Sequence, residues 1–129
     1  MRRAPRQDTY LPTSQDRALS IVLAALRRDP GDDRSLGEWA SVVHGGSERT
    51  LSRRCQRDLG MPFVEWRQRL RLVQALSMLQ DGLTVQTVAL EMGYSTSSAF
   101  IAMFHRMTRA TPDDFRKRIV QASRGSRTE

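Results

Sequence analysis

The sequence has very little cysteine: Cys55 is the only one in 129 residues. A single thiol excludes an intramolecular disulfide framework, and with only two histidines the chain has no zinc-type spacing. Long apolar runs are also missing, since the longest aliphatic stretch, residues 21–26, is far too short to cross a bilayer. No apolar segment follows the basic N-terminus, so no signal peptide is predicted. We therefore expect a cytoplasmic protein with no membrane partner, no metal and no cofactor.

Strand signals are scarce as well, because alternating runs of β-branched residues are absent. Apolar residues instead recur at three- and four-residue spacing from Ser14 onward, which predicts an all-α fold. With 39% hydrophobic and 6% aromatic residues, the chain is expected to bury one modest core.

Acidic residues are outnumbered by basic ones, 14 to 21, and Lys117 is the only lysine. A net charge of +7 predicts an acidic partner, most often nucleic acid. The charge is concentrated in residues 47–71 and 106–129, each with seven basic and three acidic residues, whereas residues 72–105 carry −2. A fold that brought both blocks to one face would form a basic stripe.

Caps and turns divide the chain into helices. A first helix is expected from Ser14 as N-cap to the turn at 29–33, burying Ala18, Val22, Ala25 and Leu26 with Leu19 and Leu23 at the flanks. Ser35 and Glu38 form a capping box for a short helix to Val43, and Ser47 caps an arginine-rich helix that ends near Gly60. A long helix from about Pro62 to Gln80 follows, with an apolar stripe formed by Phe63, Trp66, Leu70, Val73, Leu76 and Leu79.

The second half of the chain repeats the first. Shifting residues 36–67 forward by 49 positions, without a gap, aligns apolar with apolar residues and cap with cap: Ser47 with Thr96, Leu51 with Phe100, Cys55 with Phe104, Trp66 with Phe115 and Arg67 with Arg116. A duplicated helix-turn-helix unit explains this pattern. We expect a flexible arm or linker at 1–13, a first helix-turn-helix subdomain at 14–61, a connecting helix at 62–81, a second subdomain at 82–118 and a frayed tail at 119–129.

The arginine-rich segment 48–59 has two faces. Leu51, Cys55 and Leu59 share one face of a helix, and the opposite face gathers Arg49, Ser52, Arg53, Gln56 and Arg57. Arginine can fork to guanine O6 and N7, glutamine and serine can bond base edges, and a helix N-terminus attracts phosphate. A solvated charged face is the alternative, but the repeated turn and caps favour major-groove recognition.

The equivalent face of the second unit is less basic, with Ser98, Ile101, Ala102, His105 and Arg106. Ile101 and Ala102 could touch thymine methyl groups or, alternatively, pack against a missing domain. A connecting helix of about 19 residues spans about 28 Å, commensurate with the roughly 34–36 Å between successive major grooves. One chain could then bind two adjacent grooves.

The stretches RSLGEWA (34–40), SERTLSRRCQRDLGMPFVEWRQRLRLVQAL (47–76) and VALEMGYSTSSAFIAMFHRMTRATPDDFR (88–116) resemble the DNA-binding domain of the AraC/XylS family of bacterial transcription regulators. The resemblance covers about residues 15–118 and implies two helix-turn-helix subdomains that bind double-stranded promoter DNA. By position, it implies base contacts by Arg49, Ser52, Arg53, Ser97, Ser98, Ile101 and Ala102. Backbone or flanking contacts would fall on Ser47, Thr50, Arg54, Gln56, Arg57, Ser95, Thr96, His105 and Arg106.

Three features depart from the family's pattern. The first turn, residues 44–46, is one residue longer than usual, which affects the angle of the first recognition helix. Cys55 replaces a larger apolar residue and is expected to be a small buried thiol. Arg109 stands where a helix-ending glycine is usual, which weakens the expected C-terminal cap.

The sequence also bears on two other classes of function. No catalytic signature or phosphate-cradling loop is present, so an enzyme is not expected. A protein-binding module is the stronger alternative, because the arginine face could dock an acidic protein. The family also implies RNA polymerase as a possible further partner of an activator. The sequence leaves open whether the chain is a stand-alone regulator or a fragment of a larger, effector-responsive one.

Overall fold

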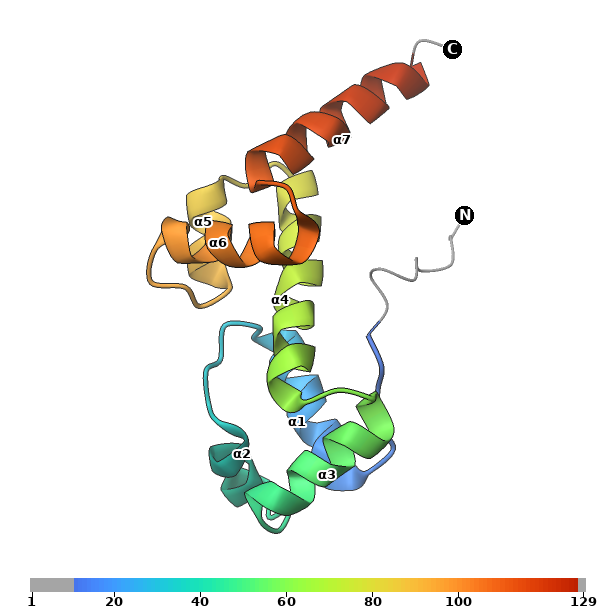
Figure 1. Ribbon diagram of the computed structural model, residues 1–129, viewed down its shortest axis with the longest axis vertical. Helices are drawn as coiled ribbons and strands as arrows, with labels where there is room; N and C mark the ends of the chain where they lie inside the picture. The colour runs from blue at the N-terminus through green and yellow to red at the C-terminus, as the bar shows by residue number, and fades with distance from the viewer. Residues whose placement is uncertain (1–10, 128–129) are drawn as a thin grey trace. The chain divides into compact units, whose positions relative to one another are not determined.

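The computed structural model describes residues 11–127, and within that range the chain is helical without strands (Figure 1). The all-α expectation is confirmed. None of the helices in this range is long and apolar enough to cross a membrane. The helices are α1 (Arg17–Arg28), α2 (Leu36–Val42), α3 (Glu48–Leu59), α4 (Phe63–Gln80), α5 (Val85–Glu91), α6 (Ser97–Thr108) and α7 (Pro112–Arg127).

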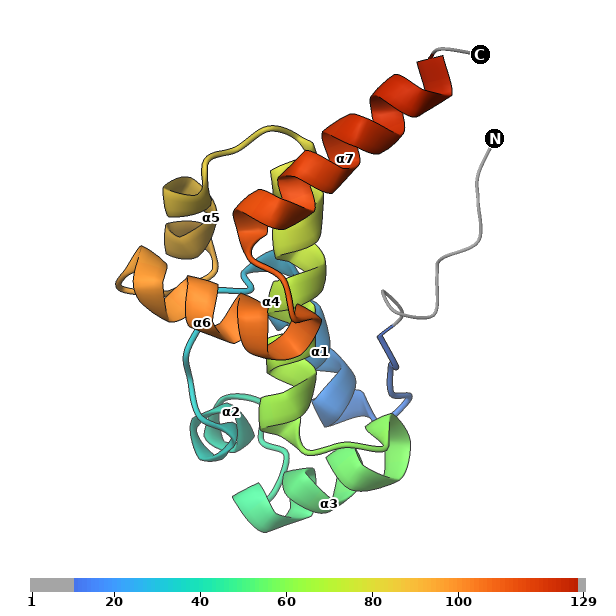
Figure 2. The same cartoon turned by 45° about the horizontal axis from the view of Figure 1, so that its top comes forward.

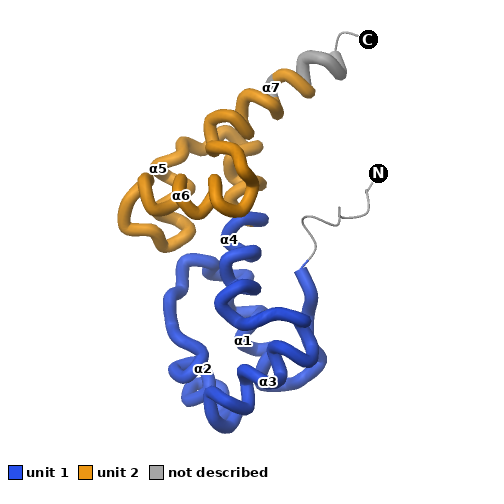
Figure 3. Tube along the Cα trace, viewed as in Figure 1, with its two compact units in different colours: residues 1–73 blue, residues 74–129 orange. Residues whose placement is uncertain are grey.

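The chain forms two compact units, which divide between Val73 and Gln74 (Figure 3). The boundary lies inside α4, which contributes buried Trp66 and Leu70 to unit 1 and buried Leu79 to unit 2. The expectation of one core was therefore wrong. The helix at 62–81 is also more than a connector, because each of its two halves supplies core residues to one unit.

The predicted repeat is confirmed in the backbone. A shift of 49 residues places the bounds of α2 on those of α5, and the bounds of α3 on those of α6. Gly45 N donates to Ala40 O at 3.0 Å, and Tyr94 N donates to Ala89 O at 3.0 Å, so the two turns are bonded alike. The first turn is consequently no longer than the second.

An arginine in each unit ties the start of the helix-turn-helix to the helix that follows it. Arg67 on α4 donates to the carbonyl of Arg34, and Arg116 on α7 donates to the carbonyl of Leu83. Both donors and both acceptors are related by the same shift of 49. The repeat thus reproduces a tertiary contact as well as the helices.

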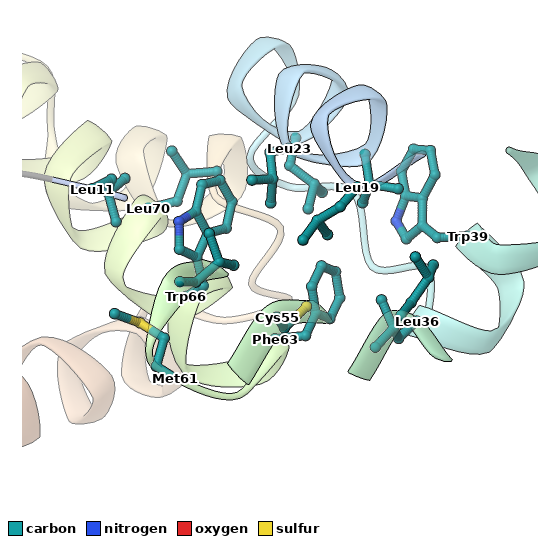
Figure 4. Close-up of a cluster of buried hydrophobic side chains, with 14 of the residues drawn as sticks. Leu11, Leu19, Leu23, Leu36, Trp39, Cys55, Met61, Phe63, Trp66 and Leu70 are labelled. Carbon is teal, nitrogen blue, oxygen red and sulfur yellow. The ribbon is translucent and has the colours of Figure 1, made fainter. Parts of the chain in front are cut away.

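The core of unit 1 is built from α1, α2, α3 and the first half of α4 (Figure 4). The N-cap of α1 is Asp16, which accepts from Leu19 N, and not Ser14 as the sequence suggested. The buried face of α1 is Leu19, Val22, Leu23 and Leu26. Ala18 and Ala25 are only half-buried, since turning the larger leucines inward removes more apolar area from water.

Residues 11–16, called the strap below, lead into α1 and are held against unit 1. Leu11 is 6% exposed within the core cluster, and Pro12 O accepts from Trp66 Nε1 at 3.0 Å. The predicted flexible arm at 1–13 is therefore wrong for Leu11 and Pro12, because Leu11 is buried and Pro12 O is the acceptor of the buried indole N–H of Trp66. Residues 1–10 of that arm lie outside the described residues.

Unit 2 has an aromatic core formed around α6 and the start of α7. Phe104 lies 5.9 Å from Phe100 and 6.0 Å from Phe115 between ring centroids, and Tyr94 lies 5.7 Å from Phe100. Figure 2 shows α7 as one continuous helix, which runs from Pro112 to Arg127.

The tail predicted to fray at 119–129 is thus helical through residue 127, while residues 128–129 lie outside the described range. Thr111 Oγ1 accepts from Asp114 N at 3.1 Å at the start of α7, and once a helix has begun each added residue contributes one backbone hydrogen bond.

Candidate nucleic-acid interface

The arginine-rich segment forms α3, whose position is set by its caps and its apolar face. Ser47 Oγ accepts from Thr50 N at 3.2 Å, and Gly60 ends the helix with a φ of 73°. Leu51, Cys55 and Leu59 are buried, as predicted. The opposite face is exposed, also as predicted, and consists of Arg49, Ser52, Arg53, Gln56 and Arg57.

Some of the arginines counted in residues 47–71 donate hydrogen bonds within unit 1. Arg67 donates to Arg34 O, and Arg71 donates to Pro30 O at 2.9 Å. Burial, followed by the charge of Arg71, lowers the pKa of Arg67. These arginines hold the loop between α1 and α2, so a charge count overstates what the block offers to a partner.

Two arginines of α3 are paired with carboxylates. Arg54 Nη1 lies 3.2 Å from an oxygen of Asp16, and Arg57 Nε donates to Asp58 Oδ1 at 2.6 Å. Arg49 and Arg53, in contrast, have no recorded side-chain partner among residues 11–127. The sequence placed all four arginines in one short segment, and the structure separates those with a carboxylate partner from those without one among residues 11–127.

Asp58 is held in its charged form. The hydrogen bond from Arg57, and then the one from Ser14, lower the pKa of Asp58 to about 2. A carboxyl whose folded pKa is depressed stabilises the fold above its unfolded pKa, about 3.9, and this contribution is lost as the pH falls toward 2. At neutral pH Asp58 is therefore ionised and carries the negative charge that pairs with Arg57.

The outer face of α6 is less basic than that of α3. Ser98, Ala102, His105 and Arg106 are exposed, whereas Ser97 and Ile101 are half-buried. This face therefore offers small, apolar and hydroxyl-bearing side chains, with one arginine.

The flanking hydroxyls have roles inside the fold. Thr96 Oγ1 accepts from Ala99 N at 3.1 Å as the N-cap of α6. Ser47 caps α3, and its hydroxyl lies 3.1 Å from that of Thr50. Each capping hydroxyl accepts from the backbone and retains a proton to donate. Ser95 is exposed at the end of the second turn.

Sequence reasoning missed the acidic partners of the arginines. Asp16 and Arg54 are 38 residues apart, and Ser14 and Asp58 are 44 apart, so no helical spacing connects them. Only the adjacency of Arg57 and Asp58 was visible. It gave no sign that the guanidinium would turn back onto its neighbour.

The comparisons with known proteins agree with this geometry. The family model for the helix-turn-helix domain matches residues 42–118. A crystal structure described as an AraC-type DNA-binding domain-containing regulator from Chromobacterium violaceum superposes with a TM-score of 0.71, at 24% identity, over 81% of this chain and 94% of that one. The chain belongs to the AraC-type helix-turn-helix family.

Two curated relatives of this AraC-type chain are described as HTH-type transcriptional regulators. NimR of Escherichia coli is 35% identical over 119 residues, which are 92% of this chain and 43% of NimR. RipA of Corynebacterium glutamicum is 35% identical over 104 residues, which are 81% of this chain and 31% of RipA. The chain therefore spans less than half the length of these two relatives.

Cys55 of the AraC-type chain is fully buried, which confirms the predicted small buried thiol. Burial, and then the charge of Asp58, raise the pKa of Cys55 to about 11. The thiol is therefore protonated and unreactive at neutral pH. Among residues 11–127, no three His, Cys, Asp or Glu side chains are grouped so that they could hold a metal ion.

Proposed function

We propose that this AraC-type chain is a sequence-specific DNA-binding transcription regulator that binds double-stranded promoter DNA. The carrying observation is the exposed face of α3, where Arg49 and Arg53 are one helical turn apart and have no side-chain partner among residues 11–127. A guanidinium without an intramolecular partner can fork to the O6 and N7 atoms of a guanine. An arginine held by a carboxylate has fewer donors and less freedom for such a contact.

The proposal gives different tasks to the two recognition helices. In α3, Arg49, Ser52 and Arg53 contact base edges. In α6, Ser98 contacts a base edge, and Ile101 and Ala102 contact thymine methyl groups. Capping and flanking residues, among them Ser47, Thr50 and Thr96, lie beside the phosphates, where a helix N-terminus favours negative charge.

The two helices enter successive major grooves, so that one chain binds two short boxes of sequence. The same proposal places the protein at the bacterial nucleoid, with RNA polymerase as a further partner. A small-molecule effector is proposed only for a longer protein, since the chain spans 43% of NimR. The proposal assigns no catalytic role to any residue.

Selection from a random pool of DNA duplexes, at near-physiological salt, tests the proposal. We expect enrichment of two short boxes about one helical turn apart. The Arg49→Ala, Arg53→Ala double variant should lose the box that α3 recognises, while Arg28→Ala, a control on the exposed end of α1, should keep it.

Absence of any enriched sequence, with a folded helical protein, would contradict sequence-specific DNA binding. An acidic protein would then become the expected partner of the α3 face. Enrichment of a single box would instead limit sequence recognition to one helix. If the logarithm of the binding constant does not fall as the logarithm of the salt concentration rises, the protein does not contact phosphates.

A further inference from the structure

The paired arginines of α3 are held by an ordered network of carboxylates, and this network lies wholly within unit 1. Asp16 and Asp58 come from different helix ends: Asp16 caps the start of α1, and Asp58 lies in the last turn of α3. The strap residue Ser14 connects them, because its Oγ accepts from Asp16 N at 3.0 Å and donates to Asp58 Oδ2 at 2.6 Å. The two pairs are thus parts of one arrangement.

Arg54 is fixed through the N-cap of α1. Asp16 Oδ2 accepts from Leu19 N at 3.0 Å and from Arg54 Nη1 at 3.3 Å, so the carboxylate that caps the helix also holds the guanidinium. The side chains of Arg54 and Asp16 are 32% and 17% exposed. The guanidinium therefore lies partly against the protein, with its remaining donors available.

Arg57 is held by two hydrogen bonds. Its Nε donates to Asp58 Oδ1 at 2.6 Å, and its Nη2 donates to Asp58 Oδ2 at 3.0 Å. The arginine side chain is 62% exposed, while that of Asp58 is 19% exposed. Because a guanidinium carries five N–H groups, this fork leaves three of them free to meet an anion.

An arginine that is paired with a carboxylate is suited to contact phosphates, and one without such a partner is suited to contact base edges. Phosphates recur at regular spacing whatever the sequence, so a pre-positioned donor binds them with little loss of side-chain entropy. Base edges differ from site to site and require a side chain that can adjust. Arg49 and Arg53 have no side-chain partner among residues 11–127, whereas Arg54 and Arg57 are each paired with a carboxylate.

We propose that Asp16 and Asp58 are positioning residues that hold Arg54 and Arg57 as the phosphate-binding pair of α3. Arg49 and Arg53 remain free to contact bases. This inference rests on the proposed DNA binding and deepens it. Simple electrostatics predicts the opposite effect, because a carboxylate beside an arginine repels phosphate and should weaken DNA binding.

The test uses Asp16→Asn and Asp58→Asn. Asparagine retains an oxygen that can accept from Leu19 N in the first variant and from Ser14 Oγ in the second. Glu65→Gln is the matched control, because Glu65 also pairs with an arginine, Arg69, at 3.2 Å on the exposed side of α4. Affinities are measured for the selected duplex and for a scrambled duplex, and unfolding midpoints are measured in parallel.

Each Asn variant should bind the selected duplex about 3- to 10-fold more weakly, because the phosphate contacts lose their pre-organisation. Binding to the scrambled duplex should weaken by a similar factor, because phosphate contacts do not depend on the base sequence. Both affinities therefore fall although the net charge rises by one. Glu65→Gln raises the net charge by the same amount and should weaken neither.

A double-mutant cycle shows whether Asp58 acts through its arginine. In an Arg57→Ala background, Asp58→Asn should cause no further loss of specific affinity. A loss that persists in that background would mean that Asp58 supports the fold alone, and would overturn the proposal. The same cycle applies to Asp16 with Arg54→Ala.

Unchanged or tighter specific binding by both Asn variants would also overturn the positioning role, and would leave the carboxylates as repulsive neighbours of phosphate. This outcome is separate from failure of the proposed function. If the wild-type protein selects no duplex, DNA recognition and the positioning role are rejected together. If it selects a duplex and the variants match it, only the positioning role is rejected.

Discussion

The two units share a backbone plan and differ in the chemistry that they present and bury. α3 and α6 both have twelve residues, begin at a hydroxyl N-cap and end at a residue in the left-handed region. On the outer surface, α3 carries exposed Arg49 and Arg53 at the positions where α6 carries exposed Ser98 and Ala102. The caps and turns are thus alike in the two units, while the exposed faces differ. The residues that position each helix are therefore distinct from the residues that it presents to a partner.

The cores of the two units differ in residue type at equivalent positions. Trp66 in unit 1 is equivalent to Phe115 in unit 2, and Cys55 is equivalent to Phe104. A large indole and a small thiol in one unit thus take the places of two phenyl rings in the other. The two units therefore reach a packed interior with different residue types at equivalent positions.

The turns show a third difference. Gly45 is buried, and an added Cβ would lie 3.1 Å from Ala18 Cβ, so a side chain there would fit only if α1 moved slightly away. The equivalent Tyr94 of unit 2 is tolerated and lies against Phe100. The first turn is therefore fixed by close approach of α1, and the second by aromatic packing.

The largest expected effect concerns the two recognition faces. The Arg49→Ala, Arg53→Ala variant should lose about 2–6 kcal/mol of specific binding free energy, since each base-contacting arginine contributes about 1–3 kcal/mol. The Ser98→Ala, Ile101→Ala variant should lose less. Titration of the selected duplex by fluorescence anisotropy measures both. Equal losses would remove the proposed difference between the units.

The second effect concerns the aromatic core of unit 2. Phe104→Ala should lower the free energy of unfolding by about 3–5 kcal/mol, because it leaves a cavity between two rings. Cys55→Ala, at the equivalent position, removes one sulfur and should cost about 1 kcal/mol.

The chain provides its own probe for this comparison, because both tryptophans, Trp39 and Trp66, belong to unit 1. In a urea titration of Phe104→Ala, the helical circular dichroism should fall at a lower urea concentration than in the wild type, with a smaller shift of tryptophan fluorescence. A Phe104→Ala transition that coincides with that of the wild type would refute the packing role.

The third effect exchanges the C-caps. Arg109 has a φ of 66° and Gly60 a φ of 73°, and left-handed backbone costs a non-glycine residue about 1–2 kcal/mol. Gly60→Ala should destabilise by about 1 kcal/mol through the backbone alone, since an added Cβ there meets nothing within 4 Å. Arg109→Gly should stabilise by about 0.5–1 kcal/mol. Thermal unfolding measures both, and a less stable Arg109→Gly variant would contradict this account.

The smallest effect concerns Cys55. Because burial raises the pKa of the thiol to about 11, the folded protein should resist a thiol reagent at pH 7 and react after unfolding. The folded state then disfavours the thiolate, so stability should decline as the pH rises from about 8.5, the usual cysteine pKa, toward about 11. Rapid modification at pH 7 without unfolding would contradict the burial of Cys55.

Local signals predicted the repeated parts of the fold well. The capping box at Ser35, the N-cap at Ser47 and the glycine stop at Gly60 are determined by neighbouring residues, so the sequence identifies them. The strap could not be predicted in this way. Leu11 is buried because the strap packs against residues of unit 1 that are distant in sequence, Trp66 of α4 among them. A single apolar residue in a polar segment gives no sign of such a contact.

The candidate site shows the same limit. The exposed face of α3 follows from helical periodicity, and the structure places Arg49, Ser52 and Arg53 on it. The pairing of Arg54 with Asp16 depends on how α1 packs against α3, and neither residue's neighbours in sequence reveal it. Charge counting therefore located the basic segment, and tertiary structure was needed to show which of its arginines are unpaired.

Base recognition by α3 is tested most directly by comparing Arg53→Ala with Arg54→Ala on the selected duplex and on its single-base variants. Arg53→Ala should lower specific affinity by about 1–3 kcal/mol and relax base preference at one position. Arg54→Ala should weaken binding to all sequences alike. Equal affinity of the wild type and Arg53→Ala for the best duplex, with base preference unchanged, would contradict the account.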